Sequence, residues 1–277
     1  MAHAVASPWN HALDQRATVL LPALSLWWRE VVRFYRQRSR VVGVILSPLI
    51  FWILLGAGFG TSVRSGAVAG APQQNYLEYF FPGALIMIVL FTSIFTMMSV
   101  IEDRKEGFLL SVMVAPIHRS AIVLGKVMGG TSLATIQGLI FLVLAPLIGI
   151  HFSVGQFGLV VLTVFLVAFA LTALGFCVAW LLDSPSAFHA IINLFLIPLW
   201  MLSGALFPIS GALGWIRAVM RANPLTYGVE GLRAILFPEM PTIIPLATSL
   251  AVLAGFCGVV FAAAYMVANR RSTKPAA

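Results

Sequence analysis

Charged residues are scarce in this chain, and their scarcity decides its class. Of the 277 residues only 9% are Asp, Glu, Lys or Arg, whereas 60% are hydrophobic, and the mean hydropathy is +0.99. Soluble domains carry about 25% charged residues on average. An ordinary soluble protein is therefore excluded, and we expect lipid to be the main solvent of this chain.

Motifs that carry out chemistry are also missing. There is no G-x-x-x-x-G-K-[ST] sequence, so the chain has no phosphate-binding loop of its own and cannot hydrolyse nucleotide alone. H-E-x-x-H and G-x-S-x-G are absent, which argues against an intramembrane metalloprotease or serine hydrolase. Cys177 and Cys257 lie in apolar stretches without the spacing of metal ligands. We expect no catalytic residue, no metal and no cofactor bound by this chain.

The long gaps between charged residues outline the membrane spans, because charge is costly in hydrocarbon. Arg40 and Arg64 enclose 23 uncharged residues, and so do Glu78 and Glu102; about 20 are needed to cross ~30 Å of hydrocarbon. No His or carboxylate with a plausible partner falls in mid-span, which argues against a secondary transporter with a midplane ion site. The gaps predict one all-α integral membrane domain with six transmembrane helices, at 41–60, 80–101, 121–150, 157–182, 187–208 and 245–268.

Lysines and arginines gather on one side of these spans. Six precede the first span, four lie between the second and the third, and three follow the last, which places 13 of the 17 on the same side. Cytoplasmic loops carry an excess of Lys and Arg, so we expect both termini in the cytoplasm. A net charge of +8 would suggest nucleic acid as a partner of a soluble protein. In a membrane protein the positive charge sets the orientation of the spans in the bilayer, and no nucleic acid partner is expected.

An amphipathic helix is predicted at 24–40, just before the first span. Its arginines recur at i, i+4, i+7 and i+11, on one face, and would contact lipid phosphates and the cytosol. Two interpretations stay open. The helix is either an anchor that only sets orientation, or a lever on the membrane that also contacts a cytoplasmic partner. The arginines of this interface helix are Arg29, Arg33, Arg36 and Arg40.

The segment 102–118 combines the densest charge cluster of the chain with an apolar run. Acidic residues at its start complement the dipole of a helix, Pro116 ends that helix, and Phe108 and Leu109 belong to an apolar face that something must cover. A short amphipathic helix without a domain of its own either lies back on the bilayer or docks into a groove of another protein. The residues alone favour neither.

The segment 210–240 is unusually long for an external connection. Asn223 and Pro224 mark a helix start, as N-cap and first helical residue. Two short, mostly apolar helices there predict a re-entrant or interface-lying hairpin on the external side. Glu230 and Arg233, at i and i+3, can pair. An ordinary external cap is the alternative.

Three motifs together resemble those of the ABC-2 type permeases, the membrane subunits of bacterial ATP-binding cassette exporters of daunorubicin-resistance and nodulation type. The resemblance covers nearly the whole chain. The motifs are Glu102-Asp103-Arg104-Lys105-Glu106-Gly107 through Ala115-Pro116, then Ile122-Val123-Leu124-Gly125-Lys126, and Asn223-Pro224-Leu225-Thr226-Tyr227 with Gly231-Leu232-Arg233.

The resemblance implies a permease in the bacterial cytoplasmic (inner) membrane. It would work as a dimer with two copies of a separate ATPase, which binds the ATP and Mg. In this comparison 24–40 is the interface helix, 102–118 is a coupling helix seated in a groove of the ATPase, and the helices of 210–240 help to close the external end of the pathway.

Membrane lipid is a further partner, and the expected substrate is an amphipathic drug-like or lipid-linked compound. A secondary transporter and a membrane enzyme are the rival classes, and each would need a site that this sequence does not display. The residues implied in ATPase coupling are Glu102, Asp103, Arg104, Lys105, Glu106, Gly107, Phe108 and Leu109, and those of the external gate are Asn223, Pro224, Tyr227, Glu230 and Arg233.

Overall fold

The computed structural model describes residues 17–59, 76–114, 117–240 and 242–269, and all its regular elements within those ranges are helices. The α-helices are α1 (Ala17–Arg36), α2 (Arg38–Phe59), α3 (Tyr76–Thr96), α4 (Met98–Lys105), α5 (Phe108–Val114), α6 (Arg119–Leu142), α7 (Val154–Leu181), α8 (Pro185–Trp200), α9 (Gly214–Ala222), α10 (Pro224–Leu236) and α11 (Leu246–Asn269). Shorter turns are the 3-10 helices η2 (Ala145–Ile148) and η4 (Ile209–Gly211) and the π-helix η3 (Met201–Ala205).

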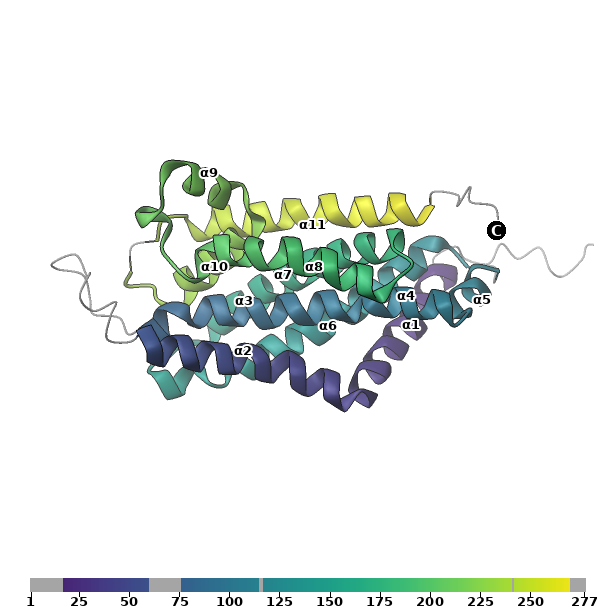
Figure 1. Ribbon diagram of the computed structural model, residues 1–277, viewed down its shortest axis with the longest axis horizontal. Helices are drawn as coiled ribbons and strands as arrows, with labels where there is room; N and C mark the ends of the chain where they lie inside the picture. Colours follow the sequence, from purple (N-terminus) through teal and green to yellow (C-terminus); the bar gives the residue numbers. More distant parts are fainter. Residues whose placement is uncertain (1–16, 60–75, 115–116, 241, 270–277) are drawn as a thin grey trace, which may run out of the picture.

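Six helical stretches are long and apolar enough to cross a membrane, which confirms the prediction of an all-α integral membrane protein. They lie side by side along the long axis of the molecule, with α5 at one end and α9 and α10 at the other (Figure 1). The stretches are Val41–Phe59, Tyr76–Lys105, Arg119–Ile148, Val154–Leu181, Pro185–Ala205 and Leu246–Asn269.

Helix α3 forms the centre of the bundle. Most of its residues are buried, and it packs against α2, α6, α7 and α10. Two threonine hydroxyls of α3 donate within the helix: Thr92 Oγ1 to the carbonyl of Ile88 (2.8 Å), and Thr96 Oγ1 to that of Thr92 (2.6 Å). Through Met97 the helix continues into α4, so the second span reaches Lys105 rather than ending at 101.

The expected coupling helix at 102–118 begins later in the structure. Glu102 to Lys105 form the last turn of α4, and Gly107, with φ +75°, turns the chain so that α5 begins at Phe108. Glycine adopts this left-handed conformation without steric cost, which is why the chain changes direction here. Pro116, expected to end the helix, lies outside the described residues.

The interface helix also has different bounds. It runs from Ala17 to Arg36, and Gln37 interrupts it before α2 begins at Arg38. Arg40 therefore belongs to the helix of the first span, and its side chain lies outside the described part. In Figure 1, α1 is inclined to the bundle at the end that also holds α5.

Two glycines let α1 lie directly on α6. A Cβ atom on Gly125 would come within 2.7 Å of the Ala23 carbonyl oxygen and of Leu26 Cβ, and one on Gly129 within 2.8 Å of Glu30 Cβ. No side chain fits in these gaps. The i, i+4 glycines thus serve close helix packing, and they bring the backbone of α6 to the polar residues of α1.

The segment 210–240 contains the predicted pair of short helices, α9 and α10. Asn223 is the N-cap of α10, where its Oδ1 accepts from the Leu225 N–H (3.0 Å), and Pro224 is the first helical residue. Leu225, Val229 and Leu232 are buried, because α10 packs against α3, α7 and α11. The buried face of α10 is therefore covered by the bundle itself, and the re-entrant position of the hairpin stays a prediction.

Candidate functional site

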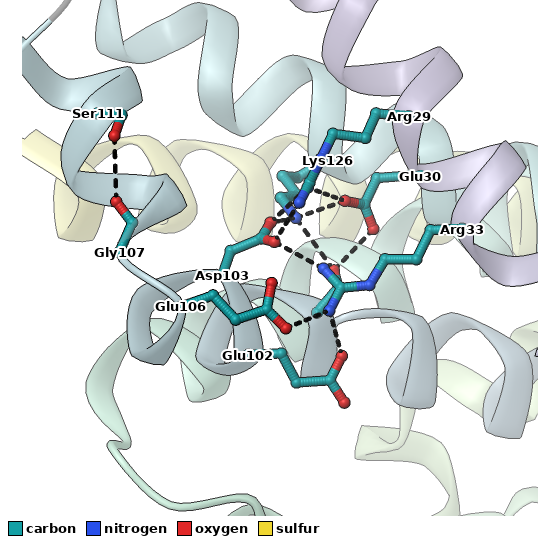
Figure 2. A network of polar contacts seen from close by, with 10 residues as sticks. Arg29, Glu30, Arg33, Glu102, Asp103, Glu106, Gly107, Ser111 and Lys126 are labelled. Carbon is teal, nitrogen blue, oxygen red and sulfur yellow. Dashed lines mark hydrogen bonds and ion pairs between the residues drawn. The ribbon is translucent and has the colours of Figure 1, made fainter.

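A buried ion network joins three helices near the α5 end of the bundle, and Lys126 of α6 is its hub (Figure 2). The Lys126 ammonium donates to Glu30 Oε1 of α1 (2.5 Å), to Ser99 Oγ of α4 (3.1 Å) and to Asp103 of α4. Ser99 in turn donates to the second oxygen of Glu30 (2.7 Å). All three donors of the ammonium are thereby used. Full pairing is what lets Lys126, Glu30 and Asp103 be almost completely buried.

Asp103 also receives two arginines from α1. Arg29 donates through both terminal nitrogens, at 2.9 and 2.7 Å, in the bidentate arrangement that makes the strongest carboxylate pairs. Arg33 donates to Asp103 (2.6 Å) and to Glu102 (2.8 Å). Donation to Asp103 raises the pKa of the Arg29 side chain above its ordinary value, so the guanidinium stays charged.

The direction of these arginines corrects the sequence expectation. Arg29 and Arg33 turn inward to α4, whereas the exposed side of α1 is apolar and carries Leu20, Leu24 and Trp28. The prediction placed the arginines against lipid phosphates. It was wrong for these two because the acidic end of α4 offers them carboxylates in a partly buried position; Arg36 is exposed.

Glu30 and Lys126 were missed as candidate functional residues; Glu30 lies in α1, before the first span, so the pair does not bear on the expectation that no carboxylate has a partner in mid-span. The signal was available in part. Glu30 is the single acid in an otherwise basic helix, and Lys126 follows four apolar or small residues and a glycine. Nothing in the sequence, however, shows that the glycines of α6 bring these two side chains together.

Helix α5 is tied to this network through Phe108. The Arg29 guanidinium lies 3.7 Å from the centre of the Phe108 ring, a cation–π contact, on the same group that binds Asp103. Leu109 is only 4% exposed and packs with Leu26 and Ile122 of its own chain. It was expected as an anchor for a partner, and in this structure its surroundings are already filled.

The outward side of α5 consists of other apolar residues. Leu110 is 62% exposed, Met113 39% and Val114 86%. Among the charged residues expected on this helix, Lys105 and Glu106 are exposed, while Arg104 donates to the last carbonyls of α7, at Trp180 (2.7 Å) and Leu182 (3.1 Å). Arg104 therefore stabilises the end of α7, where a cation complements the helix dipole.

A second polar site lies at the opposite end, where the fifth span is broken. The π-helix η3 contains Gly204 with φ +82°, and the irregular backbone leaves carbonyl groups without helical partners. Side chains supply those partners. Asn223 Nδ2 donates to Leu199 (2.6 Å) and Leu202 (3.1 Å), and Tyr79 Oη donates to Gly204 (3.1 Å).

The residues expected at the external gate meet at this break. Arg233 donates to the Gly204 carbonyl (3.1 Å), pairs with the buried Glu230, and lies 4.5 Å from the centre of the Tyr79 ring. The predicted i, i+3 pair of Glu230 and Arg233 is thus present. Tyr227 donates to the carbonyl of Arg221 (2.8 Å) and joins α10 to α9. Tyr79 was missed by the sequence reasoning, since a tyrosine at a span end is usually interfacial.

Beside the break lies a small apolar pocket of about 190 Å³ between α2, α3 and α8. Its aromatic walls are Phe51, Phe91 and Trp200, and Met201 of η3 closes one side. A second hollow of about 380 Å³ runs along α2 and shares Phe51 with the first. Together they make the α2–α8 side of the bundle uneven and rich in aromatic surface.

Neither site has the form of a catalytic or metal centre. Within the described ranges no group of three or more His, Cys, Asp and Glu residues could hold a metal ion. The charges of the first site are paired with one another, and the polar groups of the second are bound to backbone carbonyls. Both arrangements join helices together, and both place their fixed charges beside a segment where the chain changes direction.

Comparisons with known proteins agree with this description. The family model described as ABC-2 type transporter matches residues 23–237. The chain is 28% identical over 209 residues to the putative transport permease ycf38 of Cyanophora paradoxa, covering 74% of this chain and 70% of that protein. It is 24% identical over 228 residues to the daunorubicin resistance ABC transporter permease protein DrrB1 of Streptomyces coeruleorubidus (80% and 77%) and 25% identical over 231 residues to nodulation protein J of Sinorhizobium fredii (82% and 81%).

Proposed function

The chain belongs to the ABC-2 type transporter family, and from that premise we propose that it is the permease subunit of an ATP-driven exporter in a bacterial inner membrane. Two copies form the translocation pathway, and two copies of a separate ATPase bind ATP and Mg and drive the cycle. The missing phosphate-binding loop supports this division of labour, because the chain must receive work through a contact.

The outward face of α5 is the contact with the ATPase. Leu110, Met113 and Val114 present adjacent apolar side chains at the tip of the bundle, with the exposed Lys105 and Glu106 beside them. Apolar residues at the centre of an interface usually carry more binding energy than ion pairs at its rim. This exposed apolar face is the single observation that carries the proposal, and it replaces Leu109 as the expected anchor.

The ion network carries the movement of α5 into the spans. The contact between Phe108 and Arg29 joins α5 to α1. Asp103, at the end of the second span, binds Arg29 of α1 and Lys126 of the third span. A buried network whose members are all paired resists partial rearrangement. When closure of the ATPase displaces α5, these elements therefore shift as one unit.

The substrate passes along the α2–α8 side, which faces the second copy. The apolar hollows with their aromatic walls fit an amphipathic drug-like or lipid-linked compound. The broken fifth span closes this route at its external end, with Asn223, Glu230 and Arg233 holding η3 in place. Both termini lie in the cytoplasm.

Charge placed on the outer face of α5 tests the proposal. The double variant Leu110→Glu, Val114→Glu should insert normally but fail to copurify with the ATPase encoded beside it, and transport should be lost. Loss of a central apolar anchor costs roughly 2 kcal/mol or more, or about 30-fold in affinity. Leu147→Glu, equally exposed at the opposite end, is the matched control and should keep both properties.

A double variant that still copurifies with the ATPase and transports would contradict the proposed contact between α5 and the ATPase. Secondary transport is the rival function, since Glu30 and Asp103 are buried carboxylates of the kind that secondary transporters use. Transport into inverted membrane vesicles distinguishes the two. Uptake driven by a proton gradient without ATP would favour that rival. Uptake into inverted vesicles that requires ATP, and stops when the ATPase is omitted, would support the exporter.

A further inference from the structure

An apolar groove of about 250 Å³ lies between α1 and α6, and no residue of the ion network lines it. One wall is formed by α1 and the other by α6. The two ridges follow the i, i+4 rows along which side chains line up on a helix surface. The lining residues include Leu20, Leu24 and Trp27 on α1 and Leu124, Met128 and Ser132 on α6.

The polar side chains in these walls, Trp27 and Ser132, bind each other. Trp27 Nε1 donates to Ser132 Oγ (3.0 Å), which satisfies the indole N–H. An occupant of this groove needs apolar surface and no hydrogen-bonding capacity. Flexible hydrocarbon meets that requirement, whereas a polar ligand would lose its contacts with water without replacement.

The groove continues the exposed apolar surface of a candidate membrane span. Its α6 wall lies inside the candidate span Arg119–Ile148. Four and eight residues beyond Ser132, on the same row, come the exposed side chains of Ile136 and Ile140. On α1, the exposed Leu20, Leu24 and Trp28 form the outer rim. Hydrocarbon that covers the exposed row of α6 therefore runs into the groove without crossing a polar barrier.

From this geometry we infer that the groove between α1 and α6 binds one acyl chain of a phospholipid and holds it more firmly than the open lipid-facing surface does. The bound chain packs against the same two helices that carry Glu30 and Lys126. It thereby adds an apolar contact between α1 and α6 to the ion pair that already joins them. The proposed topology would place this phospholipid in the cytoplasmic leaflet. The binding itself does not depend on that topology.

Native mass spectrometry of the full chain tests the inference without a transport assay. The chain is purified from membranes, loaded from vesicles of phosphatidylglycerol and phosphatidylethanolamine, and then washed in detergent. We expect one phospholipid to remain. Leu24→Trp, which adds bulk inside the groove, should lose it, whereas Leu21→Trp, equally exposed on the same helix but outside the groove, should keep it.

Photo-crosslinking locates the retained molecule. After the detergent wash, p-benzoyl-phenylalanine at position 128 should form an adduct with the mass of a phospholipid, and the same group at position 140 on the open surface should not. Equal adducts at both positions, or retention by Leu24→Trp, would overturn the inference. So would a crosslink to a second copy of the chain or to an exported amphiphile. None of these outcomes depends on whether the chain works with an ATPase.

Discussion

Lys126 shows how much of this protein depends on a few buried charges. Its ammonium satisfies Glu30, Ser99 and Asp103 at once, but the two acids differ in what else they have. Asp103 keeps Arg29 and Arg33 as further cationic partners, whereas Glu30 keeps the neutral Ser99 hydroxyl (2.7 Å) and, as its cation, only Arg29 at a longer 3.7 Å. Removal of the lysine therefore isolates Glu30 much more than Asp103.

This difference makes a prediction for a double-mutant cycle. Lys126→Met should destabilise the protein by about 3–5 kcal/mol, because breaking a buried pair leaves a charge uncompensated. Adding Glu30→Met removes that charge and should recover part of the loss. Thermal unfolding in detergent measures both. If the double variant is no more stable than Lys126→Met alone, Glu30 does not depend on Lys126 as the geometry requires.

At the residue scale, local signals in the sequence predicted the N-cap at Asn223 and the pair of Glu230 and Arg233, since both involve neighbours in the chain. Contacts between distant residues were not accessible. The inward direction of Arg29 depends on Asp103, 74 positions later. Amphipathic periodicity cannot show whether a charged face meets water or a carboxylate.

Among the elements, the crossing of α1 and α6 is the one most sensitive to small changes. Gly129 allows Glu30 Cβ to approach, and Gly125 allows the backbone of Ala23 to approach. In an open helix position, replacing glycine by alanine stabilises by about 1 kcal/mol. At this crossing the added methyl has no space, so the sign of the effect should reverse.

Gly129→Ala should therefore lower stability by roughly 1–3 kcal/mol, the usual cost of overpacking. Gly158→Ala in α7 is the control, because no atom lies within 4 Å of a Cβ built there, and it should be neutral or stabilising. Thermal unfolding of the two variants in the same detergent gives the comparison. A stable Gly129→Ala protein would mean that α1 is not held this closely to α6.

Helix positions were largely predictable because the spacing of charges reports the thickness of the membrane. The breaks were less so. Gly107 divides α4 from α5 and Gln37 divides α1 from α2, yet glycine and glutamine also occur inside helices. The acidic run from Glu102 looked like a helix start because it suits the positive end of a helix dipole; in the structure it ends α4, where Arg29, Arg33 and Lys126 compensate it.

For the whole molecule, the proposed orientation can be measured directly. Single cysteines are introduced at Ser111 on α5 and at Glu239 beyond α10, in a background with Cys177 and Cys257 replaced by alanine. An impermeant thiol reagent added to intact cells should label position 239 and leave position 111 unlabelled until the membrane is opened, because 13 of 17 basic residues favour the α5 side as cytoplasmic. Reversed labelling would contradict the orientation, and with it the ATPase contact at α5.

The broken fifth span also sets an order of events during synthesis. The carbonyls of Leu199, Leu202 and Gly204 are bound by side chains of Tyr79, Asn223 and Arg233, and the last two are made after the span itself. In hydrocarbon an unpaired carbonyl costs several kcal/mol, so a nascent chain that ends before Asn223 cannot keep this break. We therefore expect the span to enter the bilayer as an uninterrupted helix and to open when α10 arrives. The bend is then a late product of maturation, completed by residues downstream of it.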